Sequence, residues 1–337
     1  MQFALLQKKL INAQFTWLVT GCAGFIGSNL LEALLKLDQK VIGLDNFATG
    51  YQHNIDDVLQ SITPRQRDNF NFICGDICSL QDCELVIQGV DFVLHHAALA
   101  SVPQSIQEPS QAHNANVNGF LNILELVRKY KVKRVVYASS SAVYGDLPTL
   151  PKKEDEIGIP LSPYAVNKYI NELYANVYGS CYGLETIGLR YFNVFGKRQD
   201  PNGDYAAVIP LWIKAILHNE SVYINGDGET TRDFCYVNNV VRANLLAATT
   251  INPEAVNQVY NVACGARITL NELFSNILLS LNVNEEVKPR YQDFRSGDIR
   301  HSLADITKIK ERLGYEVTHN VQDGLKEAMG WYKIFLA

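Results

Sequence analysis

Short apolar runs alternate with amphipathic segments through the first half of the chain. Five runs rich in β-branched and aromatic residues predict buried strands, at 16–20, 40–45, 71–74, 91–97 and 134–139. Between them, apolar residues recur at helical spacing, most clearly near 26–37 and 111–130. This alternation indicates βαβ units, and right-handed crossovers then predict an α/β fold with a doubly wound parallel sheet. Ligands of such a sheet bind beyond the carboxyl ends of its strands.

The pattern is less regular in the second half. After a proline-rich loop we expect a helix at 164–182 and a sixth strand at 185–190, whereas polar, Gly and Pro clusters predict loops at 202–233 and 282–301. These loops suggest a smaller C-terminal α/β lobe that closes over the sheet and binds the substrate. The predicted organisation is a surface-packed helical extension at 1–14, a sheet domain at 15–190 with 233–262, and the lobe at 191–232 with 263–337.

Composition narrows the class of protein. The 337 residues are 47% hydrophobic and 19% charged, which supplies a sizeable core and excludes a disordered chain. The formal charge of -5 provides no net positive charge to attract nucleic acid or an anionic membrane, so we expect neither as a partner. Apolar runs are too short to span a membrane, and apolar residues precede Lys8 and Lys9, the reverse of the order in a signal peptide, so we expect a cytoplasmic protein.

The seven cysteines are read as reduced thiols. Their number is odd, and the ample core makes a disulfide framework unnecessary. Cys74, Cys78 and Cys83 cluster, but no Cys-x-x-Cys pair or matching His spacing accompanies them. We therefore expect buried small hydrophobic side chains and no metal site.

A glycine-rich turn follows the first predicted strand and opens the first helix. In Thr-Gly-Cys-Ala-Gly-Phe-Ile-Gly (20–27), Gly21 permits a tight turn, Gly24 lets the backbone approach a pyrophosphate, and Gly27 lets the helix pack closely on the strand. The helix N-terminus would present free N–H groups to the anion. Glycines also occur in ordinary strand–helix turns, so the prediction of a pyrophosphate site depends on the position of the motif between the first strand and the first helix.

Asp45 strengthens the prediction of a dinucleotide site in a Rossmann sheet. It ends the second strand, where its carboxylate can accept both adenosine ribose hydroxyls and would repel a ribose phosphate. No Arg follows it directly, so NAD is favoured over the phosphorylated cofactor. The alternative is a carboxylate of a strand-end turn. Asp76 and Asn116 fit further cofactor contacts, although each alone could be a cap or turn residue.

Tyr164 and Lys168 lie one helical turn apart and so project from one helix face. The Lys168 ammonium and a positive nicotinamide would favour the phenolate and bring Tyr164 toward a working general base. The fifth strand ends in three serines, 139–141, whose hydroxyls would lie at the same sheet edge. In the alternative interpretation, these serines are caps and Tyr164 packs an amphipathic helix.

These motifs, with Ser-Ser-Ser-Ala-Val-Tyr-Gly (139–145) and Tyr-Phe-Asn (191–193), resemble the extended short-chain dehydrogenase/reductase family and, more narrowly, the UDP-sugar 4-epimerases. The resemblance runs from about residue 16 to the C-terminal helix. It implies tightly held NAD, a UDP-sugar substrate and a homodimer with a four-helix interface. The helices at 116–130 and 164–182 suit that interface, although their apolar stripes would equally serve core packing.

The resemblance also implies roles for individual residues. Tyr164 matches the base, Lys168 its helper, and Ser140 the catalytic serine, with Ser141 left as a one-residue ambiguity. The implied cofactor contacts are Gly21, Gly24, Phe25, Ile26, Gly27, Asp45, Asn46, Thr49, Gly50, Asp76, Ile77, Ala97, Ala98, Ala100, Asn116, Tyr164, Lys168 and Phe192. The implied substrate contacts are Ser101, Ser140, Asn193, Ala207, Tyr223, Arg232, Arg295, Asp298 and Ser302. At Ala100 the chain departs from galactose-type epimerases, which place a Lys there. The guanidinium groups of Arg232 and Arg295 offer the forked donors that suit a diphosphate, although outside the family either residue would more often be a charge on the surface.

Two further departures narrow the reaction. Related dehydratases and decarboxylases carry acidic residues where this chain has Ser141 and Ala142, so elimination is disfavoured and epimerisation is favoured. Ser302 stands where glucose/galactose-restricted enzymes place a bulky Tyr, which leaves room for an N-acetyl group. Alternatively, Ser302 is a loop residue that contacts nothing.

We therefore expect C4 epimerisation of UDP-N-acetylglucosamine and UDP-N-acetylgalactosamine through a 4-keto sugar. The alternatives are a UDP-glucose/UDP-galactose 4-epimerase, an epimerase of UDP-N-acetylhexosaminuronic acids, and a non-catalytic NAD-sensing protein.

Overall fold

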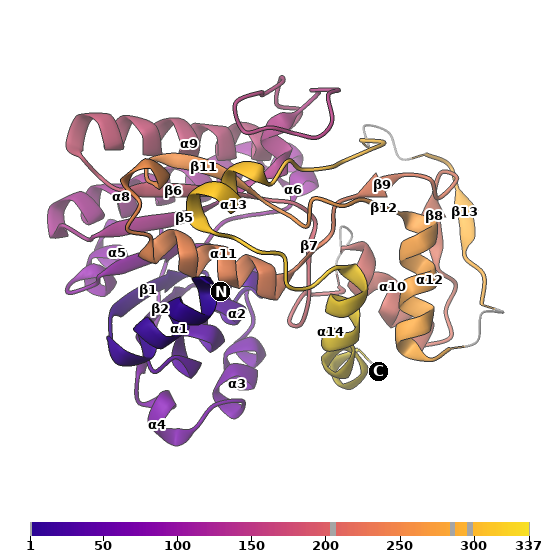
Figure 1. Cartoon of the computed structure of the whole chain (residues 1–337), viewed down its shortest axis with the longest axis horizontal. Coiled ribbons are helices and arrows are strands. Elements are labelled where there is room, and N and C mark those ends of the chain that lie inside the picture. Colours follow the sequence, from indigo (N-terminus) through magenta and orange to yellow (C-terminus); the bar gives the residue numbers. More distant parts are fainter. Residues whose placement is uncertain (1, 203–206, 284–286, 295–298, 337) are drawn as a thin grey trace.

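A seven-stranded parallel sheet forms the centre of the molecule (Figure 1). The computed structural model describes residues 2–202, 207–283, 287–294 and 299–336. The strand order is β11-β6-β5-β4-β1-β2-β3, which confirms the predicted doubly wound Rossmann fold. The strands are β1 (Thr16–Thr20), β2 (Lys40–Asp45), β3 (Phe70–Cys74), β4 (Phe92–His95), β5 (Arg134–Ser140), β6 (Thr186–Tyr191) and β11 (Gln258–Val262).

Helices cover both faces of this sheet. In Figure 1, α8 and α9 lie on one side, and α2 and α11 on the other. The helices of the sheet domain are α1 (Gln2–Asn12), α2 (Phe25–Lys36), α3 (Gln52–Gln60), α4 (Pro64–Arg67), α5 (Leu80–Ile87), α6 (Val102–Gln107), α7 (Pro109–His113), α8 (Gly119–Tyr130), α9 (Pro163–Tyr182), α11 (Val237–Thr249) and α13 (Thr307–Leu313).

The first six predicted strands are present, with small differences at their ends. The strand expected at 91–97 stops at His95, because the Ala97 N–H donates to the Thr20 hydroxyl (3.2 Å). The helix expected near 111–130 is interrupted by a π-helical turn, Asn114–Asn118, between α7 and α8. This turn brings Asn114 to the cavity described below.

The prediction of loops at 202–233 and 282–301 was wrong in part. α10 (Val208–Leu217) buries Ile209, Trp212 and Ile213, and its proline falls in the first turn, where the missing N–H breaks no helical hydrogen bond. β8 (Tyr223–Asn225) pairs in parallel with β13 (Arg290–Gln292). These elements, α12 (Leu270–Leu281) and α14 (Val321–Phe335) surround a second hydrophobic core beside the sheet, which forms the lobe in Figure 1.

Two further pairs of strands, each strand two residues long, lie outside the central sheet among the described residues. β7 (Val194–Phe195) pairs with β10 (Cys235–Tyr236), and β9 (Thr231–Arg232) pairs with β12 (Ile268–Thr269).

Packing moves one predicted domain boundary. The segment 304–315 was assigned to the lobe, yet Ile306, Ile309 and Leu313 belong to the main core, because α13 packs against the edge strand β11. At the other end of the chain, α1 buries Phe3 and Leu10 in the same core and contacts α11. The helical extension is therefore part of the sheet domain rather than a surface addition.

The seven cysteines are all free thiols, as predicted. Within the described residues, no group of three or more His, Cys, Asp or Glu side chains is arranged to hold a metal ion. Among the helices of the described ranges, none is long and apolar enough to cross a membrane.

Candidate active site

A cavity of about 260 Å³ opens at the carboxyl ends of β1, β2, β3 and β4. The predicted cofactor residues that line it are Gly21, Gly24, Asp45, Asn46, Thr49, Asp76, Ile77, Ala97 and Ala98. Further lining residues escaped the sequence prediction, among them Leu99, Cys78, Gln111, Asn114 and Ala115. The last three come from α7 and the π-helical turn, and no recognisable motif marks them in the sequence.

The glycine turn has the conformation that a dinucleotide site requires. Gly21 has φ +72°, and a Cβ there would lie 2.7 Å from the Ala97 nitrogen. A Cβ on Gly27 would lie 2.0 Å from the Gly21 oxygen, so helix and turn touch as predicted. α2 begins after Gly24 with no side-chain cap among the described residues. Its first turn, which includes Phe25 and Ile26, can therefore offer N–H groups to a phosphate.

Hydrogen bonds orient the acidic side chains of the cavity. Asp45 accepts bonds from the Ala23 N–H (2.9 Å) and the Phe47 N–H (2.8 Å). Burial raises the pKa of Asp45, and these backbone donors oppose the rise. Asp76 accepts a bond from the Asn46 amide (3.0 Å), which links the ends of β2 and β3 across the cavity wall. The carboxylates and the helix N-terminus are the groups that would hold the ribose hydroxyls and pyrophosphate of NAD.

Some predicted cofactor residues stand outside the cavity lining: Phe25, Ile26, Gly27, Gly50, Ala100, Asn116, Tyr164, Lys168 and Phe192. Asn116 is buried, and its side-chain amide makes two hydrogen bonds with the backbone of Leu99. Its Oδ1 accepts the Leu99 N–H (2.8 Å), and its Nδ2 donates to the Leu99 carbonyl (2.9 Å). It thus shapes the wall instead of lining it. Phe192 is fully buried in the main core, 5.9 Å from the Tyr144 ring. A Cβ at Gly50 would lie only 2.9 Å from Ala23, so close packing against Ala23 accounts for a glycine at this position.

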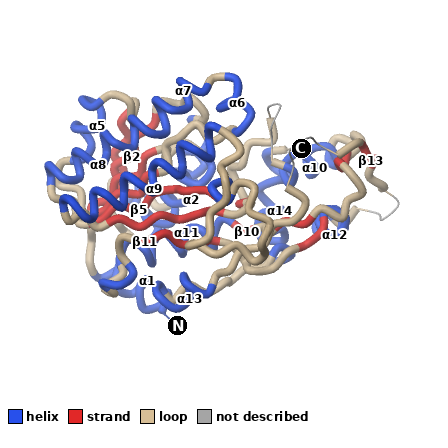
Figure 2. Tube along the Cα trace, turned by 90° about the horizontal axis from the view of Figure 1, so that it is seen from above, coloured by secondary structure: helices blue, strands red, loops and turns tan. Residues whose placement is uncertain are grey.

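The predicted catalytic groups converge where α9 passes the end of β5 (Figure 2). The Ser140 side chain lies close enough to the Tyr164 hydroxyl to favour its ionised form. The Lys168 ammonium donates to the Ala138 carbonyl (2.9 Å) and lies 5.9 Å from the Tyr164 ring centroid. Ser140 also accepts the Ala142 N–H (3.1 Å), so it caps the following 3₁₀ turn as well. Of the two candidate serines, Ser140 is the one whose side chain interacts with Tyr164, whereas Ser141 begins that turn.

The electrostatics differ from the sequence expectation at Tyr164. Burial raises the pKa of Tyr164, and the hydrogen bond with Ser140 opposes the rise in part, so the predicted lowering by Lys168 does not prevail. Burial lowers the pKa of Lys168 to about 8, which still leaves most of the ammonium charged at pH 7. Burial also lowers the pKa of His96, to about 3, so that imidazole is neutral. Lys168 is therefore a cation close to a neutral tyrosine.

The predicted substrate residues are spread over the boundary between sheet and lobe. In β9, Arg232 donates to the Thr231 carbonyl (3.0 Å), and the same carbonyl accepts the Ser302 N–H (3.1 Å). Ser302 and Arg232 therefore lie side by side. Buried Asp233 holds this region together by accepting the N–H groups of Cys264 (2.9 Å) and Ala304 (3.3 Å).

The other predicted substrate residues have local roles that the structure makes visible. Asn193 precedes β7 with φ +29°, Ala207 is the residue before α10, and Tyr223 is half exposed at the start of β8. Ser101 caps α6 by accepting the Gln104 N–H (3.2 Å). Arg295 and Asp298 lie outside the described residues.

Comparisons with known proteins identify the family of the chain. The model of the NAD dependent epimerase/dehydratase family matches residues 17–263. A putative UDP-glucose 4-epimerase of Methanocaldococcus jannaschii is 38% identical, over 94% of this chain and 98% of its own. The UDP-glucuronate 4-epimerase of Thermodesulfobacterium geofontis is 33% identical, over 94% and 96%. A solved UDP-N-acetylglucosamine 4-epimerase of Methanobrevibacter ruminantium, in complex with UDP-N-acetylmuramic acid, is 40% identical with a TM-score of 0.87, and the match covers 95% of this chain and 99% of that one. The chain therefore belongs to the NAD-dependent epimerase/dehydratase family.

Proposed function

We propose that the chain is a UDP-sugar 4-epimerase that interconverts UDP-N-acetylglucosamine and UDP-N-acetylgalactosamine. The observation that carries the epimerase assignment is the contact between the Tyr164 and Ser140 hydroxyls, with the Lys168 ammonium behind them. This group stands at the end of β5, directly beside β4, whose end contributes to the cofactor cavity. A base beside a dinucleotide site is the arrangement that oxidation of a sugar hydroxyl needs.

The chain's own residues then have defined tasks. As the phenolate, which the Lys168 ammonium and the positive charge of bound NAD would favour against the effect of burial, Tyr164 takes the proton of the C4 hydroxyl, directly or through Ser140, and returns it in the second half of the reaction. Bound NAD supplies the hydride acceptor for C4 and afterwards the donor. Arg232 holds the diphosphate while the 4-keto sugar turns and presents its other face. Because Ser141 and Ala142 offer no acid for elimination of water, the keto sugar is reduced and released as the C4 epimer.

Ser302 supports the acetylated substrates. It is half buried beside Arg232, so a small side chain lies next to the residue assigned to the diphosphate. The similarity to the Methanobrevibacter enzyme named for UDP-N-acetylglucosamine points the same way. Relatives named for UDP-glucose and UDP-glucuronate make those sugars alternative substrates. The UDP-N-acetylhexosaminuronic acids expected as an alternative from the sequence are a further candidate.

The direct test is to incubate the purified protein with UDP-N-acetylglucosamine, adding no NAD, and to follow the C4 configuration by proton NMR. We expect UDP-N-acetylgalactosamine to form, because net redox is zero and retained NAD is regenerated in each cycle. UDP-glucose, UDP-glucuronic acid and UDP-N-acetylglucosaminuronic acid are assayed in parallel. Turnover confined to any of these three would contradict the assignment of UDP-N-acetylglucosamine as the substrate and retain the epimerase.

Ser302→Tyr tests the residue behind this substrate assignment. The added ring should lower kcat/KM for the acetylated sugars by roughly tenfold or more, since it fills the space for the N-acetyl group, while UDP-glucose turnover changes little. Ser302→Ala is the matched control, because it keeps the space open. An unchanged ratio of acetylated to non-acetylated turnover in Ser302→Tyr would show that Ser302 does not select the substrate.

We also propose a homodimer. The outer face of α9 exposes Val166, Leu173, Tyr174 and Val177 by 42%, 47%, 38% and 50%, a continuous apolar stripe at helical spacing. Light scattering should give about twice the chain mass of 37.7 kDa, and Leu173→Glu should halve that value. Ile251→Glu, at an 89% exposed position away from this helix, should leave the mass unchanged. A single-chain mass for the unmodified protein would exclude the dimer.

A further inference from the structure

Glu172 is a buried carboxylate on α9 to which the proposed chemistry gives no task. Its side chain is 6% exposed and makes a two-pronged ion pair with Arg190, with N–O distances of 2.9 Å at Nε and 2.7 Å at Nη2. The Ser139 hydroxyl donates to the same carboxylate. Taking two charges out of water carries a large desolvation cost, so this pair calls for an explanation beyond stability.

The contacts of α9 with β5 form a regular series. Tyr164, Lys168 and Glu172 follow one another at intervals of four residues and so lie along one stripe of the helix. Each is tied to one of three consecutive β5 residues. Lys168 donates to the carbonyl of residue 138, Glu172 accepts the Ser139 hydroxyl, and the Tyr164 hydroxyl interacts with the Ser140 side chain.

The neighbouring strand completes the arrangement. Arg190 of β6 is the register partner of Ser139 of β5, so adjacent positions on two strands reach the same carboxylate. Arg190 is itself held by the Glu154 carbonyl (2.9 Å) and by the Tyr144 ring, whose centroid lies 4.8 Å from its guanidinium carbon. Glu172 is therefore fixed from the sheet side by groups that are themselves immobilised.

We propose that Glu172, held by Ser139 and Arg190, is a positioning residue that sets the register of α9 against β5 and thereby the contact between Tyr164 and Ser140. This inference rests on the proposed catalytic roles of those two residues. A displacement of about 1 Å between reacting groups can lower a rate about 100-fold, so a weakened anchor two turns from Tyr164 would reduce turnover without touching substrate.

Ser139→Ala tests this proposal, because it removes one anchor and leaves the Arg190–Glu172 ion pair intact. We expect kcat to fall about tenfold, with KM within about twofold of the unmodified value and bound NAD and melting temperature nearly unchanged. In a Ser140→Ala background, the same change should lower kcat by less than about twofold, since the contact that it protects is already gone. Thr186→Val on β6 is the control. It removes another buried hydroxyl, bonded to Asn257 at 3.4 Å, and should leave kcat unchanged in either background.

Three results would overturn the positioning role. These are an unchanged kcat in Ser139→Ala, an equal fall in both backgrounds, and a fall that matches a loss of folded protein. Failure of the proposed function is distinguishable from these, because Tyr164→Phe would then retain its activity and the catalytic contact itself would be refuted.

Discussion

Tyr164→Phe is expected to lower epimerase turnover about 1,000-fold or more while the protein keeps its NAD. The phenol oxygen is the proposed base, and general acid–base groups typically contribute 100- to 10,000-fold to a rate. The loss should appear in kcat, because the hydroxyl acts on the C4 proton and the cavity for the dinucleotide is built by other residues. Initial rates by NMR, together with the NAD released on denaturation, give both quantities.

Tyr169→Phe is the matched control for this experiment. It removes a phenol oxygen from the same helix, at a partly buried tyrosine that packs against the main core, and it should leave turnover within about twofold. Retained activity in Tyr164→Phe would refute the assigned base. Loss of both NAD and activity would instead place Tyr164 in cofactor retention and leave its role as the base without support.

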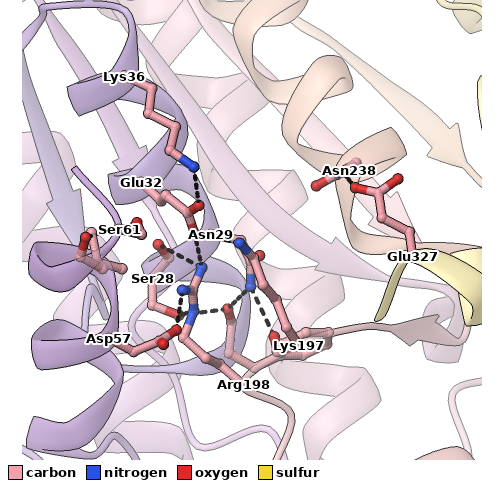
Figure 3. A network of polar contacts seen from close by, with 12 residues as sticks. Ser28, Asn29, Glu32, Lys36, Asp57, Ser61, Lys197, Arg198, Asn238 and Glu327 are labelled. Carbon is pink, nitrogen blue, oxygen red and sulfur yellow. Dashed lines mark hydrogen bonds and ion pairs between the residues drawn. The ribbon is translucent and has the colours of Figure 1, made fainter. Parts of the chain in front are cut away.

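Arg198→Met is expected to lower the free energy of unfolding by about 3 kcal/mol. Arg198 is buried in the segment that leads from β7 to the lobe, where it donates to the Asp57 carboxylate (2.7 Å) and the Ser28 hydroxyl (3.1 Å). It also pairs with Glu32 of α2, which further accepts Lys197 (2.6 Å), as Figure 3 shows. Removing the guanidinium leaves two carboxylates without their principal partner, and denaturant unfolding at pH 7 measures the result.

Acid should weaken this network in the unmodified protein. Burial would raise the pKa of Glu32, but the charges of Arg198 and Lys197 outweigh it and lower that pKa from 4.5 to about 2. A carboxyl group whose pKa is lower in the folded state stabilises the fold above its unfolded pKa. That contribution, about 3 kcal/mol, is therefore fully present above pH 4.5 and is lost as the pH falls toward 2. In Arg198→Met, stability should depend less steeply on pH across this window.

The control is Arg300→Met. Arg300 pairs with Asp227 at 2.6 Å, but the two side chains are 40% and 49% exposed. Exposed pairs contribute roughly 0–1 kcal/mol, so this variant should unfold almost as the unmodified protein does. If the two variants lose equal free energy of unfolding, the buried network of Arg198 contributes no more to stability than an exposed ion pair.

Local patterns were sufficient for much of the fold and part of the site. Strands such as Thr16–Thr20 and Lys40–Asp45 were predicted with their exact bounds, because a buried parallel strand appears in sequence as a short apolar run between turns. The Gly21–Gly27 turn and the pair of Tyr164 and Lys168 follow equally from spacing, since turns and helical faces are set within a few residues.

Other features were beyond reach because they depend on residues far apart in the chain. The hydrogen bond that Asn116 makes with the backbone of Leu99 has no signal in the sequence, because only the folded loop brings the two residues together. α10 was taken for a loop because the pattern of its core contacts with α12 and α14 is visible only once the lobe has assembled.

The sequence by itself therefore determined the doubly wound sheet, its glycine turn and the helix that carries Tyr164 and Lys168, for each is specified by periodicity or by spacing over a few residues. Only the tertiary structure decided which serine contacts Tyr164 and which buried charges lock the segments together. Glu172 with Arg190, and Arg198 with Glu32, pair across 18 and 166 positions of the chain, and no local pattern encodes such contacts. They form because a charge buried by the folding of the sheet and the lobe must find a partner there.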